Sequence, residues 1–130
     1  MSTEEKIILT EEKIKELAEE ILDLLLAHEM WIDVQIYFNG KCWSSHNKEK
    51  GTFHYNDKEN VVEYEADPRD YFEYVRNPNI LSMSFEGPFY EAINGYSGSW
   101  TVSSQFSKLL EKYGLYYELG YAWSLTCYET

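Results

Sequence analysis

Residues 31–46 read WIDVQIYFNGKCWSSH, and this stretch decides the fold. Apolar side chains alternate in its first half. One face of the expected strand carries Ile32, Val34, Ile36 and Phe38. Asn39-Gly40 follows and is the strongest short signal for a two-residue hairpin turn, because both residue types tolerate positive φ. The pattern predicts a strand over 31–38, a returning strand over 41–46, and therefore an antiparallel pair.

Further segments also have the pattern of strands. Residues 52–55 and 61–66 are predicted to form a second hairpin around the polar run 56–60. Residues 80–86 alternate again, with Leu81, Met83 and Phe85 expected to point inward. Residues 115–127 alternate over a longer stretch, which predicts one long final strand with a bend at Gly120.

The first helix is marked by its N-terminal signals. Thr10 is placed to cap it, and Leu9 and Ile14 have the spacing of a hydrophobic staple. A rotation of 100° per residue gives this helix an apolar face of Ile14, Leu17, Ala18, Ile21, Leu24, Leu25 and His28. The helix is therefore expected to pack one side on a sheet and to expose the other side to water.

Three shorter helices are predicted later in the chain. Asp67-Pro68 opens one, which the run 77–79 ends. A second extends from the Gly87-Pro88 turn to about residue 94, and a third covers residues 102–113 and stops at Gly114.

Residues 1–130 are predicted to form a single α+β domain. We expect a mainly antiparallel sheet of about five to six strands, with the N-terminal amphipathic helix and further short helices packed on it. Hydrophobic residues make up 44% of the chain, which is too many for a disordered protein. The longest apolar run, 21–27, is shorter than the about 18 residues of a membrane span, and no export signal is expected at the N-terminus. Cys42 and Cys127 suggest reduced thiols, so a cytoplasmic location is predicted.

Charge and aromatic residues are segregated along the chain. Residues 1–30 hold nine Asp or Glu against three Lys, whereas every Trp, Tyr and Phe lies later. The net charge of −12 repels nucleic acid and anionic membranes and attracts a basic surface. The expected partner is therefore a basic protein surface, with no direct nucleic acid and no membrane. The alternative is that the acidity serves only solubility.

Five carboxylates of the first helix form what we call the acidic stripe: Glu12, Glu16, Glu19, Glu20 and Asp23. Five charges over about 16 Å of helix axis give roughly one charge per 4 Å, close to the about 3.4 Å spacing along one DNA strand. Like-charged i,i+4 pairs in the stripe each cost roughly 0.2–0.5 kcal/mol of helix stability. That the helix keeps these unfavourable pairs favours a role for the stripe in binding. Lys13 and Lys15 are expected to flank the stripe without neutralising it. An ordinary solvated helix face is the alternative.

Further partner-binding candidates lie outside this helix. Glu63 and Glu65 share one face of an expected strand and would extend the acidic surface. Tyr71 and Tyr74 are candidates for contact area, because tyrosine often anchors interfaces. Burial in the core is an equal alternative for both tyrosines.

The sequence gives little support for a metal site or for nucleophilic catalysis. Cys42, His46 and His54 lack the paired spacing of a zinc site. Cys127 lies on the bulky face of the final strand, where a thiol is usually inert, and His28 lies on the apolar side of the first helix. No metal, cofactor or catalytic residue is therefore predicted.

Paired carboxylates give the enzymatic alternative. Glu86 and Glu118 could approach each other near Tyr90 and Tyr116, and two acids flanked by tyrosines are typical material of a sugar-handling cleft. Acidic residues are abundant here, so the alternative is a pair of solvated or tyrosine-bonded carboxylates.

Two C-terminal segments, SFEGPFY at 84–90 and KYGLYYELGYAWS at 112–124, resemble small uncharacterised acidic proteins of bacterial conjugative elements and phages. The resemblance covers the C-terminal third and includes no motif tied to an activity. It implies a context, because small acidic proteins of mobile elements often antagonise host restriction or CRISPR systems, some by imitating DNA. It assigns no site.

The leading hypothesis is a non-enzymatic inhibitor of anti-restriction or anti-CRISPR type. It would occupy the basic nucleic-acid-binding surface of a host defence protein, such as a nuclease, by DNA mimicry. One alternative is an accessory interaction module that uses a Tyr/Trp-rich face, for which a homodimer is possible. The other is a small enzyme or ligand-binding domain that uses Glu86 and Glu118.

Overall fold

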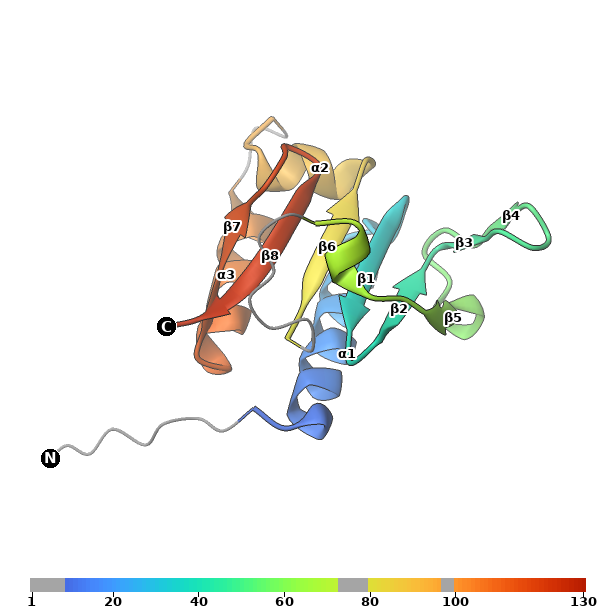
Figure 1. Ribbon diagram of the computed structural model, residues 1–130. Coiled ribbons are helices and arrows are strands. Elements are labelled where there is room, and N and C mark those ends of the chain that lie inside the picture. Colours follow the sequence, from blue (N-terminus) through green and yellow to red (C-terminus); the bar gives the residue numbers. More distant parts are fainter. Residues whose placement is uncertain (1–8, 73–79, 97–99) are drawn as a thin grey trace, which may run out of the picture.

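The computed structural model describes residues 9–72, 80–96 and 100–130. Figure 1 shows a sheet with three helices behind it: α1 (Glu11–Ala27), α2 (Pro88–Ile93) and α3 (Thr101–Lys112). The main sheet contains β1 (Val34–Phe38), β2 (Lys41–Ser44), β5 (Val62–Glu65), β6 (Ser82–Phe85), β7 (Leu115–Leu119) and β8 (Ser124–Glu129). The remaining elements are a small arm of β3 (His46–Asn47) and β4 (Thr52–Phe53), and the single-turn helices η1 (Lys58–Asn60) and η2 (Pro68–Asp70).

The six strands lie in the order β5-β2-β1-β6-β8-β7, and each neighbouring pair is antiparallel. Asn39 and Gly40 form the turn between β1 and β2, with φ values of 48° and 75°. This left-handed conformation is what a two-residue hairpin turn requires. The predicted α+β class is confirmed. Across the three described ranges, no helix is long and apolar enough to span a membrane.

The helix α1 begins where the sequence predicts. Thr10 is its N-cap, and the Thr10 hydroxyl accepts a hydrogen bond from the backbone N–H of Lys13 at 3.2 Å. The buried side chains of the helix are Ile14, Leu17, Ala18, Ile21, Leu22 and Leu25. The predicted Leu24 and His28 are only half-buried, because they lie at the margin of the apolar face.

Aromatic rings link the sheet to the two later helices. The ring of Phe89 on α2 contacts Phe85 of β6 at 4.9 Å and Phe106 of α3 at 5.4 Å between centroids. Phe106 in turn contacts Tyr117 of β7 at 5.4 Å. The three phenylalanines are almost completely buried, so they hold α2 and α3 against the same face of the sheet as α1.

The other face of the sheet is partly covered by the chain that follows β5. In Figure 1 this chain crosses in front of the sheet through η2. Tyr71 and Phe72 then pack on Tyr37 of β1, with ring centroids 5.4 and 5.3 Å apart. Small hydroxyl residues line the centre of this face: Ser82, Ser84, Ser124 and Thr126.

The predicted long final strand is wrong, because residues 115–129 form a hairpin of β7 and β8. The pairing joins Tyr117 to Cys127 and Leu119 to Leu125, so odd-numbered residues of both strands share one face. A hairpin in this register has the same alternation as one continuous strand. Periodicity alone could not distinguish the two arrangements.

The predicted hairpin of 52–55 with 61–66 is also wrong. The strand β4 pairs with β3, and β5 pairs with β2 at the sheet edge. The polar run between them turns back onto the first hairpin, because the backbone N–H of Asn56 donates to the carbonyl of Trp31 at 2.9 Å. The backbone N–H of Trp31 donates to Oδ1 of Asn56 at 3.0 Å.

Two other predicted boundaries change. The first strand begins at Val34 rather than Trp31, because Asp33 has a φ of 56° and interrupts the extended chain. Asp67 caps η2 as predicted, with its side chain accepting a hydrogen bond from the backbone N–H of Arg69 at 2.9 Å. The predicted extent of this helix is wrong, because η2 is a single turn that ends at Asp70. The predicted end at 77–79 lies outside the described residues.

Candidate functional site

The acidic stripe lies on the solvent side of α1. Glu12, Glu16, Glu19 and Asp23 are exposed, and Glu20 is half-buried beside α3. Glu12 and Glu19 form no ion pair with a described lysine or arginine.

The protein's own lysines partly neutralise the acidic stripe. Lys13 pairs with Glu16 at 3.3 Å. The prediction that Lys13 flanks the stripe without neutralising it is therefore wrong. The two remaining pairs come from distant parts of the chain. They join Lys58 of η1 to Asp23 and Lys112 of α3 to Glu20, each at 2.7 Å.

The pKa values follow these contacts. The hydrogen bonds from Lys112 and Tyr113 hold the pKa of Glu20 below its usual value. The hydrogen bond to Asp23 raises the pKa of Lys58. All three ion pairs are solvent-exposed, so each contributes little to stability and exchanges easily for a contact with a partner.

The other described partner-binding candidates lie on elements other than α1. Glu63 and Glu65 lie on the edge strand β5. Glu63 accepts a hydrogen bond from Nε1 of Trp43 at 2.8 Å, which ties it to the sheet. Tyr71 is 54% exposed on the opposite face, beside Tyr37, and Tyr74 lies outside the described residues.

The predicted carboxylate pair does not share a pocket. Glu86 lines a pocket at the end of the sheet, whereas Glu118 lines a different pocket beside Tyr71 and Tyr128. Across the described parts of the chain, no three His, Cys, Asp or Glu side chains lie close enough to hold a metal ion.

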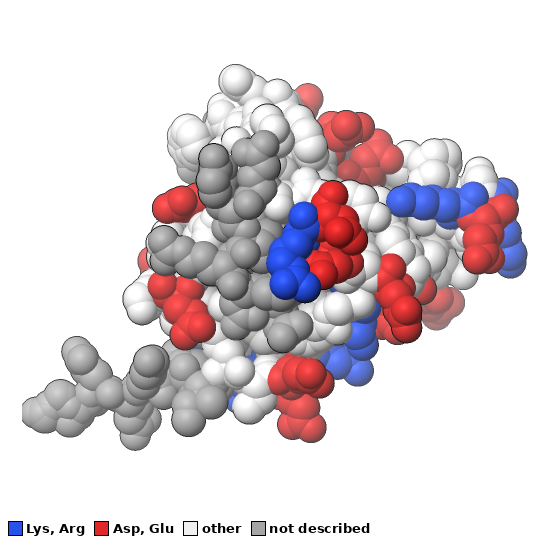
Figure 2. All heavy atoms as spheres, viewed as in Figure 1, with Lys and Arg blue, Asp and Glu red and all other residues white. Residues whose placement is uncertain are grey.

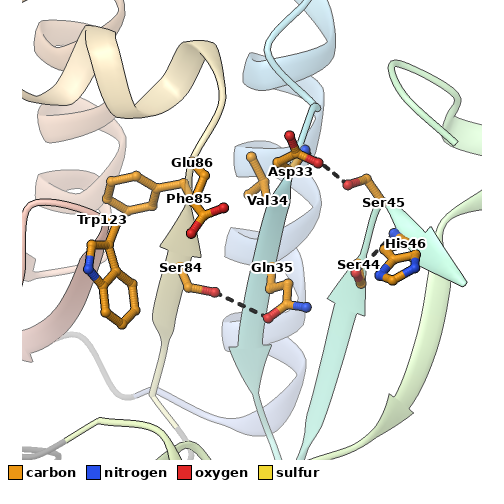
Figure 3. Close-up of a pocket in the computed structure, with 10 residues that line it drawn as sticks. All are labelled: Asp33, Val34, Gln35, Ser44, Ser45, His46, Ser84, Phe85, Glu86 and Trp123. Carbon is orange, nitrogen blue, oxygen red and sulfur yellow. Dashed lines mark hydrogen bonds between the residues drawn. The ribbon is translucent and has the colours of Figure 1, made fainter. Parts of the chain in front are cut away.

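The tertiary structure assembles a group of side chains around Glu86 that no local sequence pattern indicates. A cavity of about 250 Å³, which we call the end pocket, lies where β1 and β2 meet β6 and the β7–β8 hairpin. Figure 3 shows Trp123 on one side of it and His46 on the other, with the carboxylates of Asp33 and Glu86 between them. Gln35 and Ser84 form its floor.

The two carboxylates are brought together by backbone contacts. The backbone N–H of Glu86 donates to the carbonyl of Asp33 at 3.1 Å. Gly87 permits this approach, because a Cβ there would lie 2.5 Å from the carbonyl oxygen of Ile32. Asp33 is held in turn by Ser45, whose Oγ accepts a hydrogen bond from the Asp33 backbone N–H at 3.1 Å.

The end pocket contains two carboxylates, those of Asp33 and Glu86, and the imidazole of His46. Its lining contains no lysine or arginine, and neither Asp33 nor Glu86 forms an ion pair with a described residue. The hydroxyl of Tyr55 donates to Oδ1 of Asp33 at 2.7 Å, and this hydrogen bond raises the pKa of Tyr55. Figure 2 views the molecule from the sheet face opposite the three helices, and the acidic groups on this face form separate clusters rather than one row.

Exposed aromatic residues gather at the same end of the molecule. Tyr121 stacks on Trp123 with ring centroids 5.1 Å apart, and both remain exposed. Nδ2 of Asn94 donates to the carbonyl of Ala122 at 2.7 Å, which joins this turn to the end of α2. Tyr96 and Trp100 are also large and exposed, to 71% and 65%.

Residue types gave a partial signal for this site. Glu86 is the last residue of an expected strand, and the aromatic richness of the C-terminal segment is visible in the sequence, whereas Asp33 lies inside an expected strand and carries no signal. The pairing of Val34 with Phe85 is what places Asp33 beside Glu86, and no local pattern specifies that pairing.

Comparison with known proteins gives no assignment: no protein-family model, no curated protein and no solved structure matches the chain. The resemblance to proteins of conjugative elements and phages therefore stays an expectation.

Proposed function

We propose that this protein is a non-enzymatic, acidic interaction protein that binds a basic surface of another protein. The observation that carries the proposal is the excess of carboxylates that form no ion pair within the described residues. The net charge is −12, and the described lysines and arginines form ion pairs with only five carboxylates. Such an excess attracts a cationic partner over distances up to the Debye length and raises the association rate.

The finer part of the proposal concerns the partner. A nucleic-acid-binding surface, such as that of a host defence nuclease, has the required positive charge, and the resemblance to mobile-element proteins favours that class. The internal pairs of Glu16, Glu20 and Asp23 argue against a row of fully unpaired charges on α1. Mimicry in this protein therefore rests on overall charge and on Glu12 and Glu19 more than on a DNA-like spacing.

The test is affinity capture on the immobilised protein from a bacterial lysate. The wash contains about 0.1 M or about 1 M salt, between which the Debye length falls from roughly 10 Å to 3 Å. We expect a captured protein with a basic surface that is released at high salt, and whose binding to the chain is competed by duplex DNA. Capture that is insensitive to salt and unaffected by duplex DNA would contradict the proposal.

A pair of charge-reversed variants separates the acidic stripe from overall charge. Glu12→Lys/Glu19→Lys removes no ion pair among the residues that the structure describes, so the fold is expected to persist. Glu49→Lys/Glu129→Lys makes the same change of charge at two exposed positions elsewhere. A larger loss of binding for the first variant supports contact through the stripe, and equal losses assign the effect to net charge alone.

A second candidate function is association through the aromatic end of the molecule. Tyr96, Trp100, Tyr121 and Trp123 are all large and at least 41% exposed. Such residues commonly anchor protein interfaces. A homodimer that persists at about 1 M salt and is lost in Trp100→Ala would favour this function over charge-driven binding.

A further inference from the structure

The end pocket differs from the acidic stripe in one respect that matters for recognition. The stripe carboxylates Glu16, Glu20 and Asp23 already hold lysines of the same molecule. Asp33 and Glu86 hold none among the described residues, although they lie at adjacent strand ends. Two carboxylates in a shared concave site, without a cation beside them, favour a positively charged ligand.

The side wall of the end pocket adds a second, independent feature. Trp123 lines the pocket and is 41% exposed, with Tyr121 stacked against its ring at 5.1 Å and nearly parallel. The faces of indole and phenol rings attract cations, and tryptophan does so most strongly. Carboxylates and an aromatic wall together suit a cation that is also flat.

The floor adds hydrogen-bonding groups and fixes their direction. Oε1 of Gln35 accepts hydrogen bonds from the hydroxyls of Tyr37 at 2.6 Å and Ser84 at 3.2 Å. These bonds hold the Gln35 amide in place. The floor is therefore ordered before any ligand arrives, which lowers the entropy lost on binding.

The size of the site limits the ligand. At about 250 Å³ the end pocket is smaller than the roughly 300–1,000 Å³ of sites that enclose drug-sized molecules. A single side chain of a partner protein fits this scale better than a nucleotide or an oligosaccharide.

We propose that the end pocket binds the guanidinium group of an arginine side chain that the basic partner presents. The inference rests on the proposed function and names the chemical group recognised. Glu86 and Asp33 accept N–H hydrogen bonds from the guanidinium, and Trp123 stacks on its plane. Arginine suits the site better than lysine, because guanidinium is planar, is weakly hydrated and donates in a fork that matches carboxylates.

The experiment follows the protein by ¹⁵N NMR during titration with three short peptides. Each has glycines around one central residue, which is arginine, lysine or the neutral analogue citrulline. We expect the arginine peptide to shift the indole N–H of Trp123 and the amides of Asp33 and Glu86, with weaker binding of the lysine peptide. Citrulline binding as tight as arginine would overturn the proposal, because the carboxylates would then contribute nothing.

Variants test the individual contacts. Glu86→Gln and Asp33→Asn keep the shape of each side chain, and asparagine tolerates the positive φ of Asp33. Each is expected to weaken arginine-peptide binding by about tenfold or more, and Trp123→Leu by several-fold. Glu118→Gln is the matched control, since Glu118 lines a different pocket. Equal weakening in Glu118→Gln, or none in Glu86→Gln, would overturn the proposal.

Failure of the site and failure of the proposed function have different outcomes. A basic partner that is captured equally well by Glu86→Gln and by the unmodified protein overturns the arginine site and leaves the proposed function intact. Arginine-peptide binding at the end pocket without any salt-sensitive partner overturns the proposed function and keeps the guanidinium site.

Discussion

Replacing Gly87 with alanine tests how the end pocket is assembled. A Cβ at this position would lie 2.5 Å from the carbonyl oxygen of Ile32 and 3.3 Å from its carbonyl carbon. The colliding atoms belong to the backbone, so a side-chain rotation cannot relieve the overlap. The chain at Ile32 and the start of α2 must separate instead, which also disturbs the bond from the Glu86 backbone N–H to the Asp33 carbonyl.

The size of the effect follows from this geometry. Insertion of one carbon into a filled contact typically costs about 1–3 kcal/mol in the free energy of unfolding. For a domain of this size, each 1 kcal/mol corresponds to about 4 °C, so the Tm of Gly87→Ala should fall by roughly 4–12 °C. Binding of the arginine peptide should weaken as well, because Asp33 and Glu86 no longer meet in the same positions.

Thermal unfolding followed by circular dichroism measures the first effect, and NMR titration measures the second. Gly120→Ala is the control, because the nearest atom to a Cβ there is the hydroxyl oxygen of Ser124 at 3.2 Å. That variant should lose less than about 1 kcal/mol, since a single side chain can adjust. A Tm for Gly87→Ala within about 1 °C of the unmodified protein would refute the close approach of Gly87 to Ile32.

Three further outcomes are expected. Glu20→Gln should lower the free energy of unfolding at neutral pH by less than about 1 kcal/mol, measured by urea titration. The pKa of Glu20 is depressed in the folded state, so its contribution is complete above the unfolded value of 4.5 and disappears as the pH falls through the folded value. Wild type and variant should therefore converge in acid, and a difference that persists there would contradict the Lys112 contact. Burial raises the pKa of Cys42 to about 11 and also raises that of Cys127, so neither thiol should react with a thiol reagent at about pH 8 until urea unfolds the protein. Phe89→Ala should cost about 3–5 kcal/mol, because the ring contacts both β6 and α3; a loss below about 1 kcal/mol would contradict the packing of α2.

The sequence predicted the elements whose signals are local. Thr10 caps α1, Asn39 and Gly40 form the first turn, and Asp67 caps η2, because each depends on neighbours within a few residues. The α+β class followed from the order of these elements. The two errors in strand pairing have one cause, which is that alternation specifies which face a residue occupies and not which strand lies beside it.

The candidate site was harder to predict than the fold. The acidic stripe is visible in the sequence, but two of the three lysines that pair with it come from distant segments. Lys58 is 35 residues from Asp23, and Lys112 is 92 residues from Glu20. The end pocket has the same difficulty, because Asp33 and Glu86 approach only after β1 and β6 pair.

The amino-acid sequence by itself determined the net charge, the first helix with its acidic face, the first hairpin and the α+β class, because composition, capping and short-range periodicity fix these properties. Tertiary structure alone decided the strand order, the pairing of Glu20 and Asp23 with distant lysines, and the meeting of two carboxylates beside Trp123. The physical reason is that these features depend on contacts between segments far apart in the chain. Such contacts are selected by burial of the whole core and leave no signature in any one segment.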